Sequence, residues 1–250
     1  WNNTTSVCGT TGGGNITISG GAADSSTPAL PAGYASGYGT TNFNGFVSSI
    51  STGDGFTTGA MLGYTTTGTY GVNLFSAGGD IIVRGKSLNG TGGWRAGITM
   101  WTNTQVNSGT GKIYFEGDSI GNTGTWNAGI EMNLNNSCIS TANRFAFTSA
   151  NNDLVNPAIT LIGRAGSSGA SNGITNYCGS ASNTDVTIQS LGTGGISMIG
   201  STQASAEYGI DLNGVNVLAR SGKIKLDGGL YGVATGQNIG VSAGRTTFGS

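Results

Sequence analysis

The sequence repeats itself at a fixed distance, and this repetition restricts the fold more than any other feature. Residues 79–102 align with residues 111–134 without a gap, at an offset of 32 positions. The alignment matches Trp94 with Trp126, and it also matches apolar positions, glycines and an Ala-Gly-Ile triplet. Weaker copies follow in the second half of the chain. Such self-similarity is typical of repeat architectures, in which each unit stacks on its neighbours.

The repeats contain short runs in which apolar and polar residues alternate. Val186-Thr187-Ile188 is one example, and each run spans only three to five residues. This period of two predicts strands with one buried face. Because so short a strand is unstable alone, we expect each one to pair in register with its copies in neighbouring units. The sequence therefore predicts an all-β fold, a right-handed parallel β-helix (β-solenoid) of about nine windings, with Gly and Asn at its corners.

The composition fits this fold and also divides the chain. Gly, Ser, Thr and Asn fill 132 of the 250 positions, which resembles a flexible linker. The apolar fraction of 36% and the presence of only three prolines argue against disorder. Residues 76–250 are predicted to form the β-helix repeats. The less regular residues 1–75 are predicted to form an N-terminal cap, or first coils with a long loop.

Charge and residue usage exclude several classes of function. The chain has 10 basic residues, 11 acidic residues and no histidine. The formal net charge of −1 gives no reason to expect a nucleic-acid partner. There is no apolar run long enough for membrane insertion, and no cysteine or histidine spacing typical of zinc sites. We therefore expect no metal and no cofactor.

Cysteine and tryptophan supply the candidate site residues. Among Cys8, Cys138 and Cys178, the pair Cys138–Cys178 is the better candidate for a disulfide, and free or buried thiols are the alternative. Trp94 and Trp126 occupy the same repeat position. They are predicted either to stack as an aromatic ladder that seals a corner, or to form a carbohydrate-stacking platform.

The charged residues give no clear catalytic constellation. The 32-residue offset places Arg84 opposite Glu116, which predicts an exposed cross-strand ion pair. Glu131 lies between Ile130 and Met132, so we expect its side chain to point outward to solvent. No two carboxylates are forced into the spacing of a glycosidase, and we expect no catalytic residues and no enzymatic activity.

Phrases such as GDIIVRGKSLNG (residues 79–90) and SGKIKLDGG (residues 221–229) resemble the shafts of filamentous haemagglutinin-type adhesins and autotransporter passengers. The resemblance covers about residues 77–250. It implies an extracellular, non-enzymatic β-helix at a microbial cell surface, with glycans or proteins of host or neighbouring cells as partners. A filament subunit that self-associates through coil ends or lateral faces is the first alternative. A polysaccharide lyase or hydrolase is the second.

Overall fold

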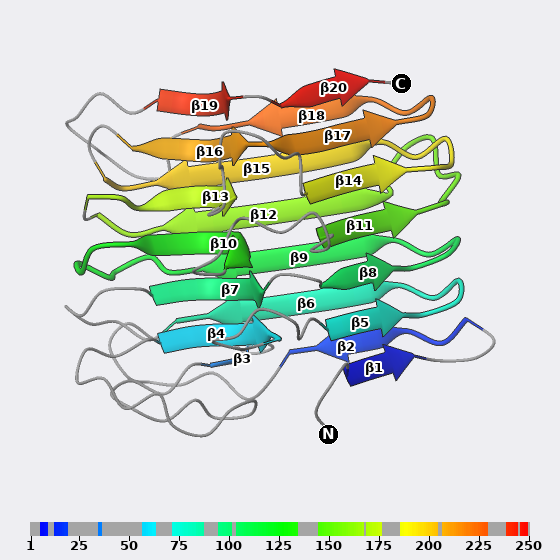
Figure 1. The fold of residues 1–250 in the computed structure, drawn as a ribbon, viewed down its shortest axis with the longest axis horizontal. Coiled ribbons are helices and arrows are strands. Elements are labelled where there is room, and N and C mark those ends of the chain that lie inside the picture. Colours follow the sequence, from blue (N-terminus) through cyan, green and yellow to red (C-terminus); the bar gives the residue numbers. More distant parts are fainter. Residues whose placement is uncertain are drawn as a thin grey trace.

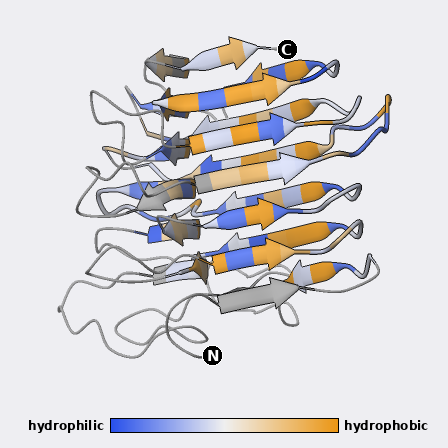
Figure 2. Ribbon diagram, turned by 45° about the vertical axis from the view of Figure 1, so that its right-hand side comes forward, coloured by the Kyte–Doolittle hydropathy of each residue, from blue (hydrophilic) through white to orange (hydrophobic). Residues whose placement is uncertain are grey.

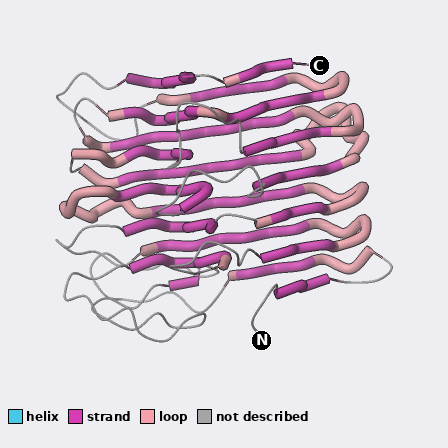
Figure 3. The backbone as a smooth tube through the Cα atoms, viewed as in Figure 1, coloured by secondary structure: helices cyan, strands magenta, loops and turns pink. Residues whose placement is uncertain are grey.

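The protein consists of strands and connecting loops in the parts that the computed structural model describes (Figure 3). These parts are residues 6–9, 13–19, 35–36, 57–63, 72–87, 95–101, 104–134, 145–167, 169–176, 186–204, 207–229, 239–244 and 246–249. All pairings between their strands are parallel, which confirms the predicted all-β class.

The strands form three sheets, called A, B and C. Sheet A contains β1 (Ser6–Gly9), β5 (Val72–Phe75), β8 (Gln105–Asn107), β11 (Phe145–Ser149), β14 (Val186–Ser190), β17 (Val215–Ala219) and β20 (Thr247–Gly249). Sheet B contains β2 (Ile16–Ile18), β6 (Ile81–Lys86), β9 (Ile113–Asp118), β12 (Ile159–Ala165), β15 (Ile196–Thr202) and β18 (Ile224–Asp227), with β3 (Ala35–Ser36) also paired to β6. Sheet C contains β4 (Thr57–Leu62), β7 (Arg95–Trp101), β10 (Asn127–Leu134), β13 (Asn172–Asn176), β16 (Tyr208–Asn213) and β19 (Ile239–Gly244).

The chain visits the three sheets in the same order in every turn, which makes the molecule a parallel β-helix. In Figure 1 it runs left to right along the near side, returns behind through sheet B and rises toward the C-terminus, so the coil is right-handed. The described residues form six complete coils and one strand of a seventh. The described residues thus hold fewer than the predicted nine windings, because one coil takes three strands and three loops. Seven stacked strands span about 30 Å.

The register confirms the repeat found in the sequence. Ile81 pairs with Ile113 and Val83 with Phe115, at the predicted offset of 32 positions. One continuous ladder runs through sheet B and contains Ile16, Ile81, Ile113, Ile159, Ile196 and Ile224. Its central members are buried, and Figure 2 shows apolar and polar residues alternating along the strands. The interior is therefore a stack of like residues.

Glycines inside the strands let sheets B and C approach each other closely. A Cβ added at Gly117 of β9 would lie 1.9 Å from the carbonyl oxygen of Gly129 in β10, and one added at Gly163 of β12 would lie 2.0 Å from that of Gly173 in β13. The prediction that glycines are corner residues was thus incomplete. Many of them stand where two backbones meet with no side chain between them.

Serines form the corner between sheets A and B. Ser149 and Ser190 end their strands and Ser108 directly follows β8; all three are fully or almost fully buried and follow one another from coil to coil. The hydroxyl of Ser108 donates to the carbonyl oxygen of Gly111 at 2.6 Å, and Ser149 donates to the same oxygen at 2.7 Å. These bonds satisfy carbonyl groups that a sharp turn removes from the sheets.

Candidate functional site

The outer face of sheet B carries a charged ladder. The Glu116 carboxylate forms ion pairs with two arginines. It accepts a hydrogen bond from the Arg84 Nε at 3.1 Å and another from a terminal nitrogen of Arg164 at 2.8 Å. The Tyr114 hydroxyl donates to the same carboxylate at 2.9 Å. The predicted pair Arg84–Glu116 is confirmed, but Glu116 is only 6% exposed and two arginines share it. The group ties three coils together, which is a structural role.

The outer face of sheet C holds an unusual acid, Glu131. Burial raises its pKa to about 7. The hydrogen bond that the Thr99 hydroxyl donates at 3.3 Å lowers the pKa, but by less than burial raises it. Glu131 lies on the outer face as expected, but it is only partly exposed, because surrounding protein atoms restrict its access to water. In register, Glu131 is followed by Thr175 and then by Asp211 two coils away. Two carboxyl groups thus share one stripe of this face.

The outer face of sheet A is uncharged along its described strands. No described strand of this sheet contains Asp, Glu, Lys or Arg. Register neighbours such as Thr187 and Asn216 place amide and hydroxyl groups beside each other from coil to coil. Further members of this face are Asn73, Gln105, Asn107, Thr148 and Gln189. Such a face presents hydrogen-bond donors and acceptors but creates little electrostatic field.

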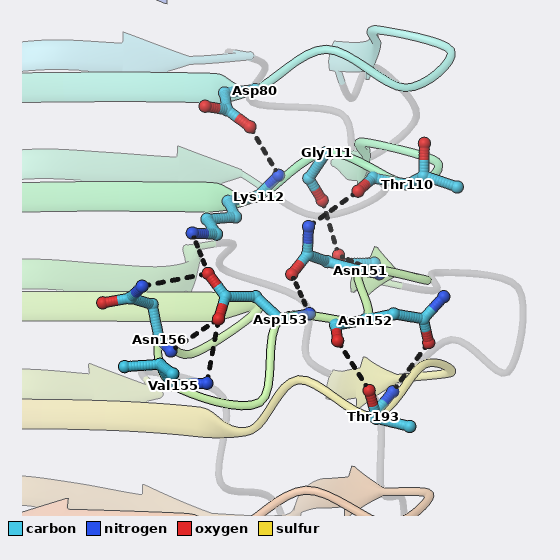
Figure 4. A network of polar contacts seen from close by, with 11 residues as sticks. Asp80, Thr110, Gly111, Lys112, Asn151, Asn152, Asp153, Val155, Asn156 and Thr193 are labelled. Atoms are coloured by element: carbon cyan, nitrogen blue, oxygen red, sulfur yellow. Dashed lines mark hydrogen bonds and ion pairs between the residues drawn. The ribbon is translucent and has the colours of Figure 1, made fainter.

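A network of polar side chains joins successive loops at the corner between sheets A and B (Figure 4). The backbone N–H of Lys112 donates to Asp80, and the amide of Asn151 donates to the carbonyl oxygen of Thr110, each at 2.8 Å. Thr193 donates its hydroxyl to the Asn152 carbonyl oxygen, also at 2.8 Å. Each loop is thereby fixed to the loop of the coil before it.

Asp153 is the centre of this corner. Its carboxylate pairs with the Lys112 ammonium at 2.7 Å and accepts the backbone N–H groups of Val155 at 2.8 Å and Asn156 at 3.1 Å. Together with the Asn156 side-chain amide, these donors hold the pKa of Asp153 well below its usual range, with the Lys112 bond the largest cause. The loop that follows Asp153 is consequently held in one conformation.

Trp126 lies at the loop that enters sheet C. Its φ is 64°, in the left-handed region that bulky residues avoid, and its side chain is 50% exposed. Its carbonyl oxygen accepts the backbone N–H of Arg95 in the preceding coil at 3.3 Å. A tryptophan kept at a strained backbone position with half of its surface accessible is a candidate binding residue.

The other predicted site residues lie outside the parts of the chain that the structure describes. This holds for Trp94, the partner of Trp126 in the repeat, and for Cys138 and Cys178, the candidate disulfide. Cys8 lies on β1, opposite Leu74. The carbohydrate platform and the disulfide therefore stay predictions.

The described residues contain no group of three metal-ligating side chains close enough to hold an ion. Within the same residues there is no helix long and apolar enough to cross a membrane. Comparisons of the chain with protein-family models, with curated proteins and with solved structures gave no match.

Proposed function

We propose that this protein is an extracellular structural and adhesive β-helix at a microbial cell surface, which binds glycans of a neighbouring or host cell through its outer surface. Trp126 carries this proposal. Its left-handed backbone costs about 1–2 kcal/mol relative to glycine, which is the usual residue for such a turn. Strain of this kind persists where a side chain is needed for another purpose.

The exposed indole and, separately, the uncharged outer face of sheet A fit a neutral sugar. An indole offers a flat apolar face, and tryptophan combines that face with one N–H donor. The uncharged amides and hydroxyls of sheet A offer donors and acceptors that suit sugar hydroxyl groups. Repetition of these groups from coil to coil allows several weak contacts with one polymer, and such contacts add through effective concentration.

The test compares Trp126→Gly with Trp126→Phe on a glycan array and in urea unfolding. An adhesive role predicts that Trp126→Gly abolishes glycan binding while its stability stays equal or rises, because glycine relieves the backbone strain. Trp126→Phe should retain weak binding. If Trp126→Gly instead lowers stability by about 2 kcal/mol or more and no glycan binds the native chain, the tryptophan seals a corner and the adhesive proposal fails.

Hydrolysis of a polysaccharide is the second candidate, and the stripe on sheet C favours it. Glu131 has a pKa of about 7, which suits a general acid, and Asp211 lies two coils away, at about 9–10 Å along the stack. Inverting glycosidases place their carboxyl groups roughly 6.5–9.5 Å apart. Depolymerisation of acidic polysaccharides that is lost in Glu131→Gln and in Asp211→Asn, but kept in Asp227→Asn, would support this activity.

A further inference from the structure

One loop at the corner between sheets A and B is longer than its counterparts. Residues 150–158 connect β11 to β12 with nine residues, whereas the loops 76–80, 108–112 and 191–195 have five each. The extra residues include Leu154 and Val155, whose side chains are 83% and 88% exposed. In stacked repeats, insertions into single units gather on one face, which is often the face that binds a partner.

This loop presents its apolar residues in a fixed conformation. The bonds from Asp153 to Lys112, Val155 and Asn156 hold the turn, and Asn151 accepts the backbone N–H of Asp153 at 3.0 Å. Because the loop is ordered before any contact forms, binding loses little conformational entropy. Leu191, in the loop of the next coil, adds a third apolar side chain that is 41% exposed.

The charges along this corner are arranged with opposite signs on either side of the loop. Asp80 lies two coils before the loop, and Arg220 and Lys223 lie two coils after it. Between them, Lys112 and Asp153 neutralise each other. A two-fold axis through the loop, perpendicular to the solenoid axis, would place Asp80 at the corner of one molecule opposite Arg220 and Lys223 at the corner of another. A parallel arrangement would instead bring Arg220 against Arg220.

We propose that this corner binds a second copy of the chain in an antiparallel two-fold dimer. Leu154 and Val155 of each copy pack against the same residues and against Leu191 of the other copy, while Asp80 of each copy faces Arg220 and Lys223 of the other. The same patch serves both molecules, so the contact closes after two copies and gives a dimer, not a filament.

Sedimentation velocity of the whole chain over a range of concentrations tests the dimer. The contact is small, so we expect dimers to appear at about 10–100 µM chain. Leu154→Ser/Val155→Ser should weaken association at least tenfold, since both side chains are exposed and leave the core unchanged. Val241→Ser, which alters an exposed apolar residue on β19 of sheet C, should leave the dimer intact.

Charge variants test the antiparallel arrangement. Arg220→Glu/Lys223→Glu should weaken the dimer several-fold, and adding Asp80→Lys to these changes should restore it. Stronger association in Arg220→Glu/Lys223→Glu alone would overturn the antiparallel geometry. The proposal fails if the native chain stays monomeric at every concentration, or if the Leu154 and Val155 changes leave its dimer unaffected. It also fails if these changes instead abolish binding to phosphatidylcholine vesicles, because the loop would then be a lipid contact.

Discussion

Replacing Gly163 by alanine tests the contact between sheets B and C directly. The added Cβ would lie 2.0 Å from the carbonyl oxygen of Gly173, 2.7 Å from its carbonyl carbon and 2.8 Å from the Ile174 Cγ1. Ordinary contact begins at 3.4 Å, so the two backbones would have to separate by about 1.4 Å. Both belong to hydrogen-bonded strands, and neither moves alone.

The expected loss in the free energy of unfolding comes from overpacking and from weakened hydrogen bonds. Forcing extra volume into a packed interior costs about 1–3 kcal/mol, occasionally more. Displacing one strand weakens two or so ladder bonds, each worth about 1 kcal/mol net. Gly163→Ala should therefore lower the free energy of unfolding by about 3–5 kcal/mol. With an m-value of about 3 kcal/mol/M, the urea midpoint falls by about 1–1.7 M.

Urea unfolding followed by far-UV circular dichroism measures this change. Gly169→Ala is the matched control, because an added Cβ there meets nothing within 4 Å and the midpoint should stay the same. Gly249→Ala is a graded control, with its nearest atom at 3.5 Å. If Gly163→Ala unfolds at the same midpoint as Gly169→Ala, sheets B and C do not meet backbone to backbone, and the argument for the interior glycines is refuted.

Three further variants test the polar groups. Glu116→Ala should lower stability by about 2–3 kcal/mol in urea unfolding, because it leaves two arginines without their shared carboxylate, whereas Asp227→Ala at an exposed pair should change it by less than about 0.5 kcal/mol. The raised pKa of Glu131 should make stability fall as pH rises from about 4.5 to 7, and Glu131→Gln should remove that dependence. If Glu131→Gln and the native chain show the same dependence of stability on pH, the carboxyl group is not buried. Asp153→Ala should speed hydrogen exchange of the Val155 amide, and equal rates would mean that Asp153 does not hold the loop.

Much of the fold could be predicted because it depends on the period of the sequence. The 32-residue offset identified Ile81 and Ile113 as neighbours, and the alternation of polar and apolar residues identified the buried faces. These features are local or strictly repeated, so no distance between sheets is needed to find them. The interior glycines were missed for the opposite reason. Gly117 and a corner glycine look alike in sequence, and only the separation of two sheets distinguishes them.

The candidate sites depended on tertiary structure to a greater degree. The pattern around Glu131 gave the direction of its side chain correctly, but the cover over that side chain comes from other parts of the protein. The strained φ of Trp126 leaves no mark on composition or spacing. The long loop at residues 150–158 did leave a signal, since its two adjacent apolar residues interrupt a polar stretch, but the repeat alignment did not extend to it.

The ladder in sheet B also shows how such a chain can accommodate insertions. Ile113 and Ile159 pair directly although they stand 46 positions apart, while Ile81 and Ile113 pair at 32. Nine of the 14 extra positions enter between sheets C and A and five enter at the serine corner between sheets A and B, yet the strands stay aligned in all three sheets. Segments can therefore be added at a corner without repacking the interior. This separation makes the solenoid a natural scaffold for grafting foreign peptides, and it frees the loops to diverge faster than the strands beneath them.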